Sequence, residues 1–309
     1  MFSNKISLIT SIFVATVFIS ACQPQEPLQS AEKSELQSEK KEVELKGVIE
    51  KLNLNLPKCE DKNCPELSIE RLSSNQFFVD QVIDQHIIEI FKQILDPEDL
   101  EDSMVKVEKS ASDINAENIN ETAKQKLEYQ LIPYIHSFLQ LDQEVKELSA
   151  NHKISFMIKP KILNSEGPLA TVVLNSSNYL GGAHGSSSQQ YFNFDLESKK
   201  LVPLTEILEK DQLPKLEKQA YEAFKTWIVE SELSTDVNEY EQVWKFKLAN
   251  NYYLGTHGLI LQYGEYEIGP YIVGLPRLTI PYDQLNGIIK AKYLPQATAT
   301  SEVLISANK

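Results

Sequence analysis

The stretch Asn178-Tyr-Leu-Gly-Gly-Ala-His-Gly185 decides how the C-terminal half of the chain folds. Its glycines allow positive φ or a close approach of the backbone to another segment. Apolar, strand-forming runs lie on both sides, Thr171-Val-Val-Leu174 before it and Gln190-Tyr-Phe-Asn-Phe-Asp-Leu196 after it. The pattern therefore predicts a β-hairpin that carries a titratable side chain, His184, at its tip.

A second segment rich in tyrosine and glycine, Gly264 to Gly274, follows the predicted strand Gly258-Leu-Ile-Leu-Gln-Tyr263. Exposed tyrosines anchor interfaces because they combine a large apolar body with a polar tip. Tyrosines at the edge of a core are the alternative. The candidate binding residues lie on the glycine turns and in or beside this segment: Gly181, Gly182, His184, His257, Tyr263, Tyr266, Glu267 and Tyr271.

His184 and His257 both lie in glycine turns, so their side chains can in principle converge with Asp195 or Glu267. Such a cluster supports acid–base or metal chemistry. In the structural alternative, the glycines shape hairpins and the imidazole bonds a neighbouring loop. The sequence contains no Gly-x-Ser-x-Gly elbow, His-Glu-x-x-His pattern or phosphate loop. It therefore predicts no catalytic residue, no metal ligand and no cofactor.

The composition is that of a globular protein with an acidic balance. The chain has 309 residues, of which 42% are hydrophobic and 24% charged, and its formal net charge is -14. Nucleic acid is excluded as a partner, because phosphate backbones need a basic face. A basic protein partner would be attracted, although acidity is also common among soluble envelope proteins.

The N-terminus predicts a lipoprotein. Lys5 precedes an apolar run that is too short to span a membrane, and Ile19-Ser-Ala-Cys22 resembles a bacterial lipobox. The resemblance implies a signal peptide at 1–21 and acylation of Cys22, which anchors the chain to the membrane. Gln23 resembles the sorting pattern for the outer membrane, with the protein facing the periplasm or the surface. A secretory signal with a chance cysteine is the alternative.

After the anchor, the composition shifts several times. Residues 22–42 are polar and predict a flexible tether, and 296–309 a loose tail. The shift near residue 150 predicts an N-terminal domain at 43–150 and a C-terminal domain at 151–295. One compact unit with two subdomains is the alternative.

The first domain begins with a predicted strand, Leu52-Asn-Leu-Asn-Leu56, and a return strand, Leu67 to Leu72. Between them, Cys59 and Cys64 predict a disulfide, because close cysteine pairs oxidise outside the cytoplasm. A metal pair is the alternative, but no nearby histidine supplies further ligands.

Two long amphipathic patterns follow, Asn75 to Leu95 and Glu117 to Leu148, and Pro133 should kink or divide the second. Strands separated by long helices, without a βαβ rhythm, indicate an α+β fold. We expect antiparallel sheets with long helices packed against them in two small subdomains.

Six short motifs resemble, in order, the C-terminal domain of RsiV-type anti-sigma factors. They are Gly181-Gly-Ala-His184, Tyr191-Phe-Asn-Phe-Asp195, Leu204-Thr-Glu-Ile-Leu208, Gly258-Leu-Ile-Leu261, Tyr266-Glu-Ile-Gly-Pro-Tyr271 and Ile280-Pro-Tyr282. The preceding strands and helix resemble the small domain found before it there and in PdaC-type cell-wall deacetylases. Together the resemblance covers roughly residues 43 to 290.

The resemblance implies a surface that binds protein, with lysozyme-type muramidase as the leading candidate, or a peptidoglycan ligand. It does not carry over the anti-sigma role, which needs a cytoplasmic segment and a spanning helix, nor deacetylation, whose metal pattern is absent from this sequence. The alternatives are a peptidoglycan or polysaccharide hydrolase or deacetylase that uses a His184/His257 cluster, and a structural envelope lipoprotein.

Overall fold

A computed structural model describes residues 43–60, 62–95, 121–148 and 153–295. The predictions for the signal peptide, Cys22, the tether and the C-terminal tail lie outside the described residues. Both hydrophobic cores and all the secondary structure given below belong to one compact unit, Glu42–Lys309.

The described chain contains two sheets, six helices and three 3-10 turns. The first sheet has the order β1(Gly47–Lys51), β2(Glu66–Ser74), β3(Ser155–Asn164), β4(Ala170–Tyr179), β5(Ser186–Asp195) and β6(Lys200–Leu201). The second has the order β7(Tyr252–Leu254), β8(Gly258–Gln262) and β9(Arg277–Pro281). The helices are α1(Phe77–Ile94), α3(Ala123–Gln130), α4(Ile132–Leu148), α5(Leu204–Ile207), α6(Leu213–Glu230) and α7(Val237–Glu241), and the 3-10 turns are η2(Tyr271–Val273), η3(Tyr282–Leu285) and η4(Ala291–Tyr293).

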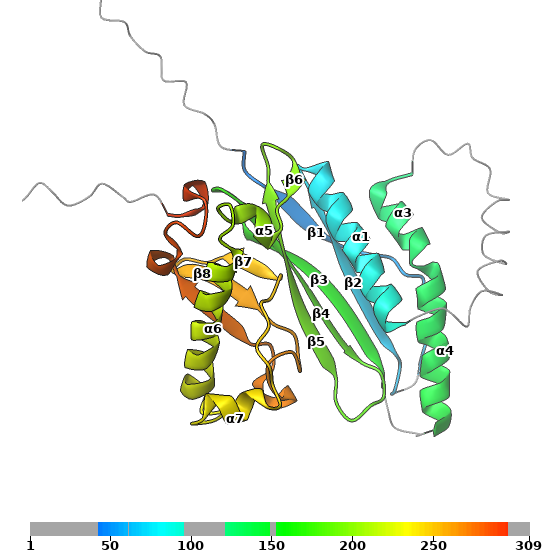
Figure 1. Ribbon diagram of the computed structural model, residues 1–309. Coiled ribbons are helices and arrows are strands. Elements are labelled where there is room, and N and C mark those ends of the chain that lie inside the picture. The colour runs from blue at the N-terminus through cyan, green and yellow to red at the C-terminus, as the bar shows by residue number, and fades with distance from the viewer. Residues whose placement is uncertain (1–42, 61, 96–120, 149–152, 296–309) are drawn as a thin grey trace, which may run out of the picture. The chain divides into compact units, whose positions relative to one another are not determined.

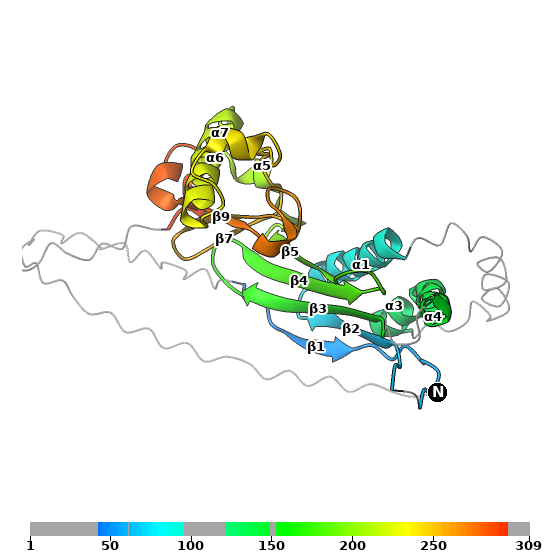
Figure 2. The ribbon, with the colours of Figure 1, turned by 90° about the horizontal axis from the view of Figure 1, so that it is seen from below.

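The α+β prediction is confirmed, with one difference in strand direction. All neighbouring strands are antiparallel except β2 and β3, which pair in parallel from Glu66↔Ser155 to Ile69↔Ile158. Parallel neighbours need a long crossover, and α1, α3 and α4 lie between these two strands in the chain (Figure 2). Strands from both sides of residue 150 thus share one sheet. The domain limits at 43–150 and 151–295 stay a prediction.

The first core lies between one face of the six-stranded sheet and α1, α3 and α4 (Figure 1). The buried side of α1 includes Ile83, Ile87 and Phe91 at the spacing of one helical face. Phe91 packs against Phe156 of β3, with ring centroids 4.7 Å apart. The predicted division of the later helix is also confirmed, since α3 ends and α4 begins next to Pro133.

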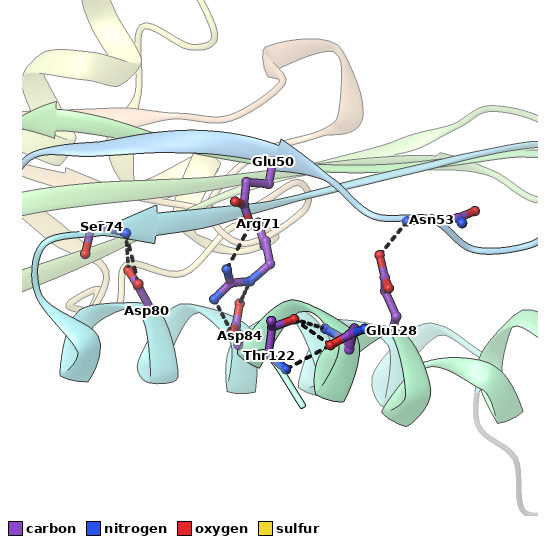
Figure 3. Close-up of polar contacts among 9 residues, drawn as sticks. Glu50, Asn53, Arg71, Ser74, Asp80, Asp84, Thr122 and Glu128 are labelled. Carbon is purple, nitrogen blue, oxygen red and sulfur yellow. Dashed lines mark hydrogen bonds and ion pairs between the residues drawn. The ribbon is translucent and has the colours of Figure 1, made fainter. Parts of the chain in front are cut away.

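A buried arginine fixes α1 to the sheet. Arg71 of β2 is 3% exposed and donates from Nη2 to Asp84 Oδ2 at 2.8 Å and from Nη1 to Glu50 Oε2 at 3.1 Å (Figure 3). Asp80, one turn earlier on α1, accepts from the main-chain N–H of Ser74. Burial raises the pKa of Asp84 more than the Arg71 guanidinium lowers it, and the neighbouring carboxylates add to that rise.

The strand predicted at Leu52 to Leu56 is wrong, because β1 ends at Lys51. Leu52 still pairs with Ile69 through its N–H, but the N–H of Asn53 turns to Glu128 Oε1 of α3, at 2.7 Å (Figure 3). Asn55 then takes a positive φ of 47°, which a strand does not allow. The alternating leucines bury one side of a coil rather than of a strand.

The second core is built from α6, the second sheet and the turns that follow it. Asn251 joins this half to β5. Its side chain accepts from the N–H of Tyr191 at 2.9 Å and donates to the carbonyl of Gln189 at 2.7 Å. One amide side chain thus bonds two main-chain groups of β5. Since Asn251 directly precedes β7, these bonds hold the start of β7 against β5.

Candidate functional site

The predicted glycine turn connects β4 and β5, which pair from Ala170↔Phe194 to Asn178↔Ser186. Gly181 has a φ of +89°, which favours glycine, and a Cβ there would lie 3.0 Å from the methyl groups of Val145 on α4. A Cβ on Gly185 would lie 2.7 Å from the carbonyl of Asn178. These contacts explain why the turn needs glycine on both sides of His184.

His184 at the tip of this turn meets the tyrosine-rich segment. Its ring stacks on Tyr271, with centroids 3.9 Å apart and planes 23° apart, and its Nε2 lies 3.0 Å from the hydroxyl of Tyr266. Its Nδ1 is 3.0 Å from the carbonyl of Gly185, which can only accept, so Nδ1 carries the proton. In the neutral ring, Nε2 therefore accepts from Tyr266. Tyr271 also donates to the same carbonyl of Gly185, at 3.1 Å.

Acidic side chains hold the tyrosine-rich loop in place. Glu265 accepts from the N–H of Ser187 on β5 at 2.9 Å, which ties the loop to the hairpin. Glu267 accepts from the N–H of Gly264 at 2.6 Å and pairs with Lys247 at 2.9 Å. Tyr266 itself takes a positive φ of 62°. The loop conformation is thus fixed before any partner arrives.

The assembled rings remain open to solvent. Tyr266 is 49% exposed, Tyr271 37% and Ile272 89%. Trp244 continues the stack, with its ring 6.5 Å from that of Tyr266. We call this surface the aromatic tip, and it consists of His184, Trp244, Tyr266, Tyr271 and Ile272. Sequence reasoning missed Trp244, because it lies outside the tyrosine-rich segment and meets Tyr266 only in the folded chain. It also missed Ile272, which lies within that segment but is not one of its tyrosines.

Two candidate residues lie elsewhere. Tyr263 is almost fully buried in the second core, where it donates to the carbonyl of Lys247 at 2.8 Å. His257 is exposed and precedes β8, whereas the aromatic tip gathers around the loop after β8. A strand rises roughly 3.3 Å per residue, so the whole length of β8 separates His257 from that loop. His184 and His257 therefore do not come together, and the His184/His257 cluster considered as an alternative is not formed.

Cys59 and Cys64 are joined as a disulfide in the loop between β1 and β2, with Cα atoms 5.8 Å apart. Within the described ranges, no group of three or more His, Cys, Asp or Glu side chains is arranged to hold a metal ion. In the same ranges, no helix combines the length and the apolar character needed to cross a membrane.

A polar groove of about 400 Å³ lies on the face of the first sheet that points away from α1. Its floor consists of two rows of side chains that run across the strands from β2 to β5. Leu275, from the loop before β9, forms part of its wall. The first row is Ser68, Met157, Ser177 and Ser187, which are register partners. The second row is Glu70, Lys159, Asn175 and Gln189.

Comparison with known proteins gives one family match. Residues 205–283 match the family described as "Protein of unknown function (DUF3298)". This segment contains every residue of the aromatic tip except His184.

One curated relative is the peptidoglycan-N-acetylmuramic acid deacetylase PdaC of Bacillus subtilis (strain 168), which is 22% identical over 177 residues. The alignment covers 53% of this chain and 36% of the deacetylase, so the chain spans about a third of that protein's length. The assignment to RsiV-type proteins stays a prediction.

A solved structure of a DUF3298 family protein shows the same fold. A DUF3298 family protein from Pseudomonas aeruginosa PAO1 matches 82% of this chain and 96% of its own, with a TM-score of 0.59 and 23% identity. A DUF3298 family member from Bacteroides fragilis NCTC 9343 covers 80% of this chain and 93% of its own, with a TM-score of 0.48 and 18% identity. At such identities the first likeness defines the fold alone.

Proposed function

We propose that this chain is a binding protein of the cell envelope without catalytic activity, and that the aromatic tip is its recognition surface. The observation that carries the proposal is the exposed stack of His184, Tyr266 and Tyr271. Hydrogen bonds fix this stack, because His184 bonds the carbonyl of Gly185 and the hydroxyl of Tyr266, and Tyr271 bonds the same carbonyl. Aromatic side chains that stand rigid and exposed make effective anchors, because little conformational freedom is lost when they bind.

The contacts of His184 support binding rather than catalysis. Both ring nitrogens are engaged, one by the main chain of the turn and the other by Tyr266. Glu267, one of the two acids considered for a cluster with His184, is occupied by Lys247 and the N–H of Gly264. A general base needs a free nitrogen or carboxylate within reach of a substrate proton, and these groups instead hold the loops together.

The envelope assignment rests on two supports. The relative PdaC acts, by its name, on peptidoglycan, and residues 1–22 predict a lipoprotein anchored through Cys22. We further propose a basic, lysozyme-type muramidase as the partner, as the sequence resemblance implies. The net charge of -14 favours a basic partner and should accelerate its association.

Calorimetry of residues 43–309 against a purified c-type lysozyme, at low and moderate salt, tests the proposal. These residues include both cores and all the described secondary structure. Wild-type protein should give saturable one-to-one heat, and affinity should fall with added salt, because screening weakens attraction between exposed charges. Tyr271→Ala should weaken binding at least tenfold.

Tyr129→Ala on α3 is the matched control, because Tyr129 is 38% exposed and lies outside the aromatic tip. It should bind as wild type does. Equal binding by Tyr271→Ala and wild type would overturn the role of the tip. No heat with lysozyme under either salt condition would overturn muramidase as the partner.

A further inference from the structure

The polar groove on the first sheet has a lining that differs from the rest of this acidic chain. Five serines and two amides, Asn175 and Gln189, dominate it. Its two charged residues, Glu70 and Lys159, lie 3.3 Å apart as an ion pair. The groove therefore carries no net charge, which selects against strongly acidic or basic ligands, since a bare charge would lose hydration without gaining a counter-charge.

Several groove groups are free to bond a ligand. Among the residues that the structure describes, the hydroxyls of Ser68, Ser177 and Ser187 have no hydrogen-bond partner. Each hydroxyl can donate and accept. These three serines lie in a single row with Met157, and that row crosses four strands spaced about 4.8 Å apart, which gives a length of about 14 Å.

The amides beside this row are held in fixed orientations. Gln189 Nε2 donates to Asn175 Oδ1 at 3.0 Å, and Asn175 Nδ2 donates to the carbonyl of Lys159 at 3.2 Å. Gln189 Oε1 accepts from Arg277 Nη2 at 2.6 Å. Because neighbouring groups fix the amides, a ligand would meet a preformed polar row, which lowers the entropic cost of binding.

The floor of the groove excludes a strand-like peptide as the occupant. A peptide that adds to a sheet needs an unpaired edge, but the groove floor is a sheet face, and β3 and β4 are paired on both sides. β5 pairs with β6 only at Phe194 and Asp195, and beside the groove its outer main-chain groups are bonded by the side chains of Glu265 and Asn251. The apolar lining is restricted to Met157, Ile158 and Leu275, of which Met157 is 48% exposed. The groove therefore offers many hydrogen-bonding groups to a ligand that carries hydroxyls. It offers little apolar surface against which an apolar side chain could pack.

We propose that this groove binds an uncharged, N-acetylated hexosamine oligosaccharide. The free serine hydroxyls match sugar hydroxyls, and the fixed amides of Asn175 and Gln189 suit the acetamido groups. Met157 and Leu275 offer apolar surface to the acetyl methyl groups and to the C–H face of a sugar ring. The groove shares no residue with the aromatic tip. An experiment can therefore disprove one binding site and leave the other proposal standing.

Calorimetry of residues 43–309 with chitohexaose tests the groove without lysozyme. Binding should be saturable and nearly independent of salt, because the ligand is uncharged and the groove lining carries no net charge. Cellohexaose, which lacks acetamido groups, should bind at least tenfold more weakly. A fully deacetylated chitosan hexamer, which is cationic, should also bind at least tenfold more weakly.

Ser177→Leu should abolish the heat, because the larger side chain fills the middle of the serine row. Thr279→Leu on β9 is the matched control, since it changes an exposed strand position outside the groove, and it should bind normally. Tyr271→Ala should also bind normally, which separates this site from the aromatic tip. Thermal unfolding of each variant verifies that it is folded.

Absence of heat with chitohexaose for the folded wild type would overturn the proposal. Equal affinity for chitohexaose and cellohexaose would overturn the acetamido specificity, and normal binding by folded Ser177→Leu would overturn the location.

Discussion

Asn193 and Tyr252, 59 positions apart in the chain, are joined by a buried hydrogen bond in which Asn193 Nδ2 donates to the main-chain carbonyl of Tyr252 at 2.7 Å. Asn193 is 1% exposed, and its Oδ1 accepts from the hydroxyl of Thr171 at 2.9 Å. The side chain thus links β4, β5 and β7, and with them the two sheets. Because both bonds are buried, they should contribute more than a surface contact does.

Asn193→Ala should lower the free energy of unfolding by about 3 kcal/mol, because it leaves the carbonyl of Tyr252 and the hydroxyl of Thr171 buried without partners. Urea denaturation of residues 43–309 measures this change. Asn250→Ala, at an exposed position next to the same segment, should change stability by less than about 0.5 kcal/mol. Equal effects of the two substitutions would contradict the role of Asn193.

Stability should fall as the pH rises above 10 because of buried phenols. Tyr252 donates to the carbonyl of Val202 at 2.8 Å, and burial raises its pKa far above 10.0. Above pH 10 the unfolded state releases this proton while the folded state keeps it, so folding loses up to about 1.4 kcal/mol per pH unit for this phenol.

Tyr252→Phe should therefore cost about 1 kcal/mol at pH 7, where the hydrogen bond is lost, and show a shallower loss of stability above pH 10. Urea denaturation at pH 7, 10 and 11 provides the comparison. Tyr129→Phe, at an exposed phenol, should keep the wild-type slope. A Tyr252→Phe curve parallel to that of wild type would show that Tyr252 does not carry this dependence.

Arg71→Met should lower stability by about 3–5 kcal/mol at pH 7, since it leaves the carboxylates of Asp84 and Glu50 without their cation. Burial already raises the pKa of Asp84, and loss of the guanidinium should raise that pKa further. The deficit should therefore shrink as the pH falls from 7 through this pKa towards 3.8, because protonation removes the buried charge.

The double variant Arg71→Met/Asp84→Asn serves as the control for this effect. It should recover part of the stability at pH 7 and lose most of the pH dependence. Chemical denaturation between pH 7 and 4 measures both. A deficit that stays constant over that range would exclude Asp84 as the cause.

The disulfide between Cys59 and Cys64 should contribute about 2 kcal/mol, because it closes a short loop between β1 and β2. The double variant Cys59→Ser/Cys64→Ser should unfold at lower urea concentration and still bind any ligand of the aromatic tip. Thiol labelling with and without reductant checks the bond in the wild type. Labelling of both cysteines without reductant would show that the bond does not form in solution.

Local patterns in the sequence predict much of the fold. The hairpin around His184 follows from glycines between two apolar runs, α1 follows from an apolar face at helical spacing, and Pro133 marks a helix junction. The parallel pairing of β2 with β3 could not be predicted in this way. It depends on how a crossover of three helices packs, and no nearby residues encode that.

The sequence predicts the two halves of the aromatic tip but not their meeting. Local patterns predict the glycine turn and the tyrosine-rich loop as separate segments. Their contact could not be predicted, because His184 and Tyr266 lie 82 positions apart in the chain. Tyr263 shows a different difficulty. Its residue type and its place in the sequence group it with Tyr266 and Tyr271 as a binding candidate, but its side chain is buried in the second core. Tyr263 continues the alternation of Leu259 and Leu261, which are buried in the second core, so its place along the strand rather than its residue type turns it inward.

The parallel pairing of β2 with β3 also constrains how the protein is made. On the ribosome, β2 emerges early but has to wait for its second neighbour until the nascent chain has passed residue 158. A fragment that begins after residue 150 would leave β3 with one unpaired edge, and exposed edges recruit other chains into aggregates. Soluble production of the aromatic tip should therefore require the N-terminal strands, even though they do not contribute to the tip.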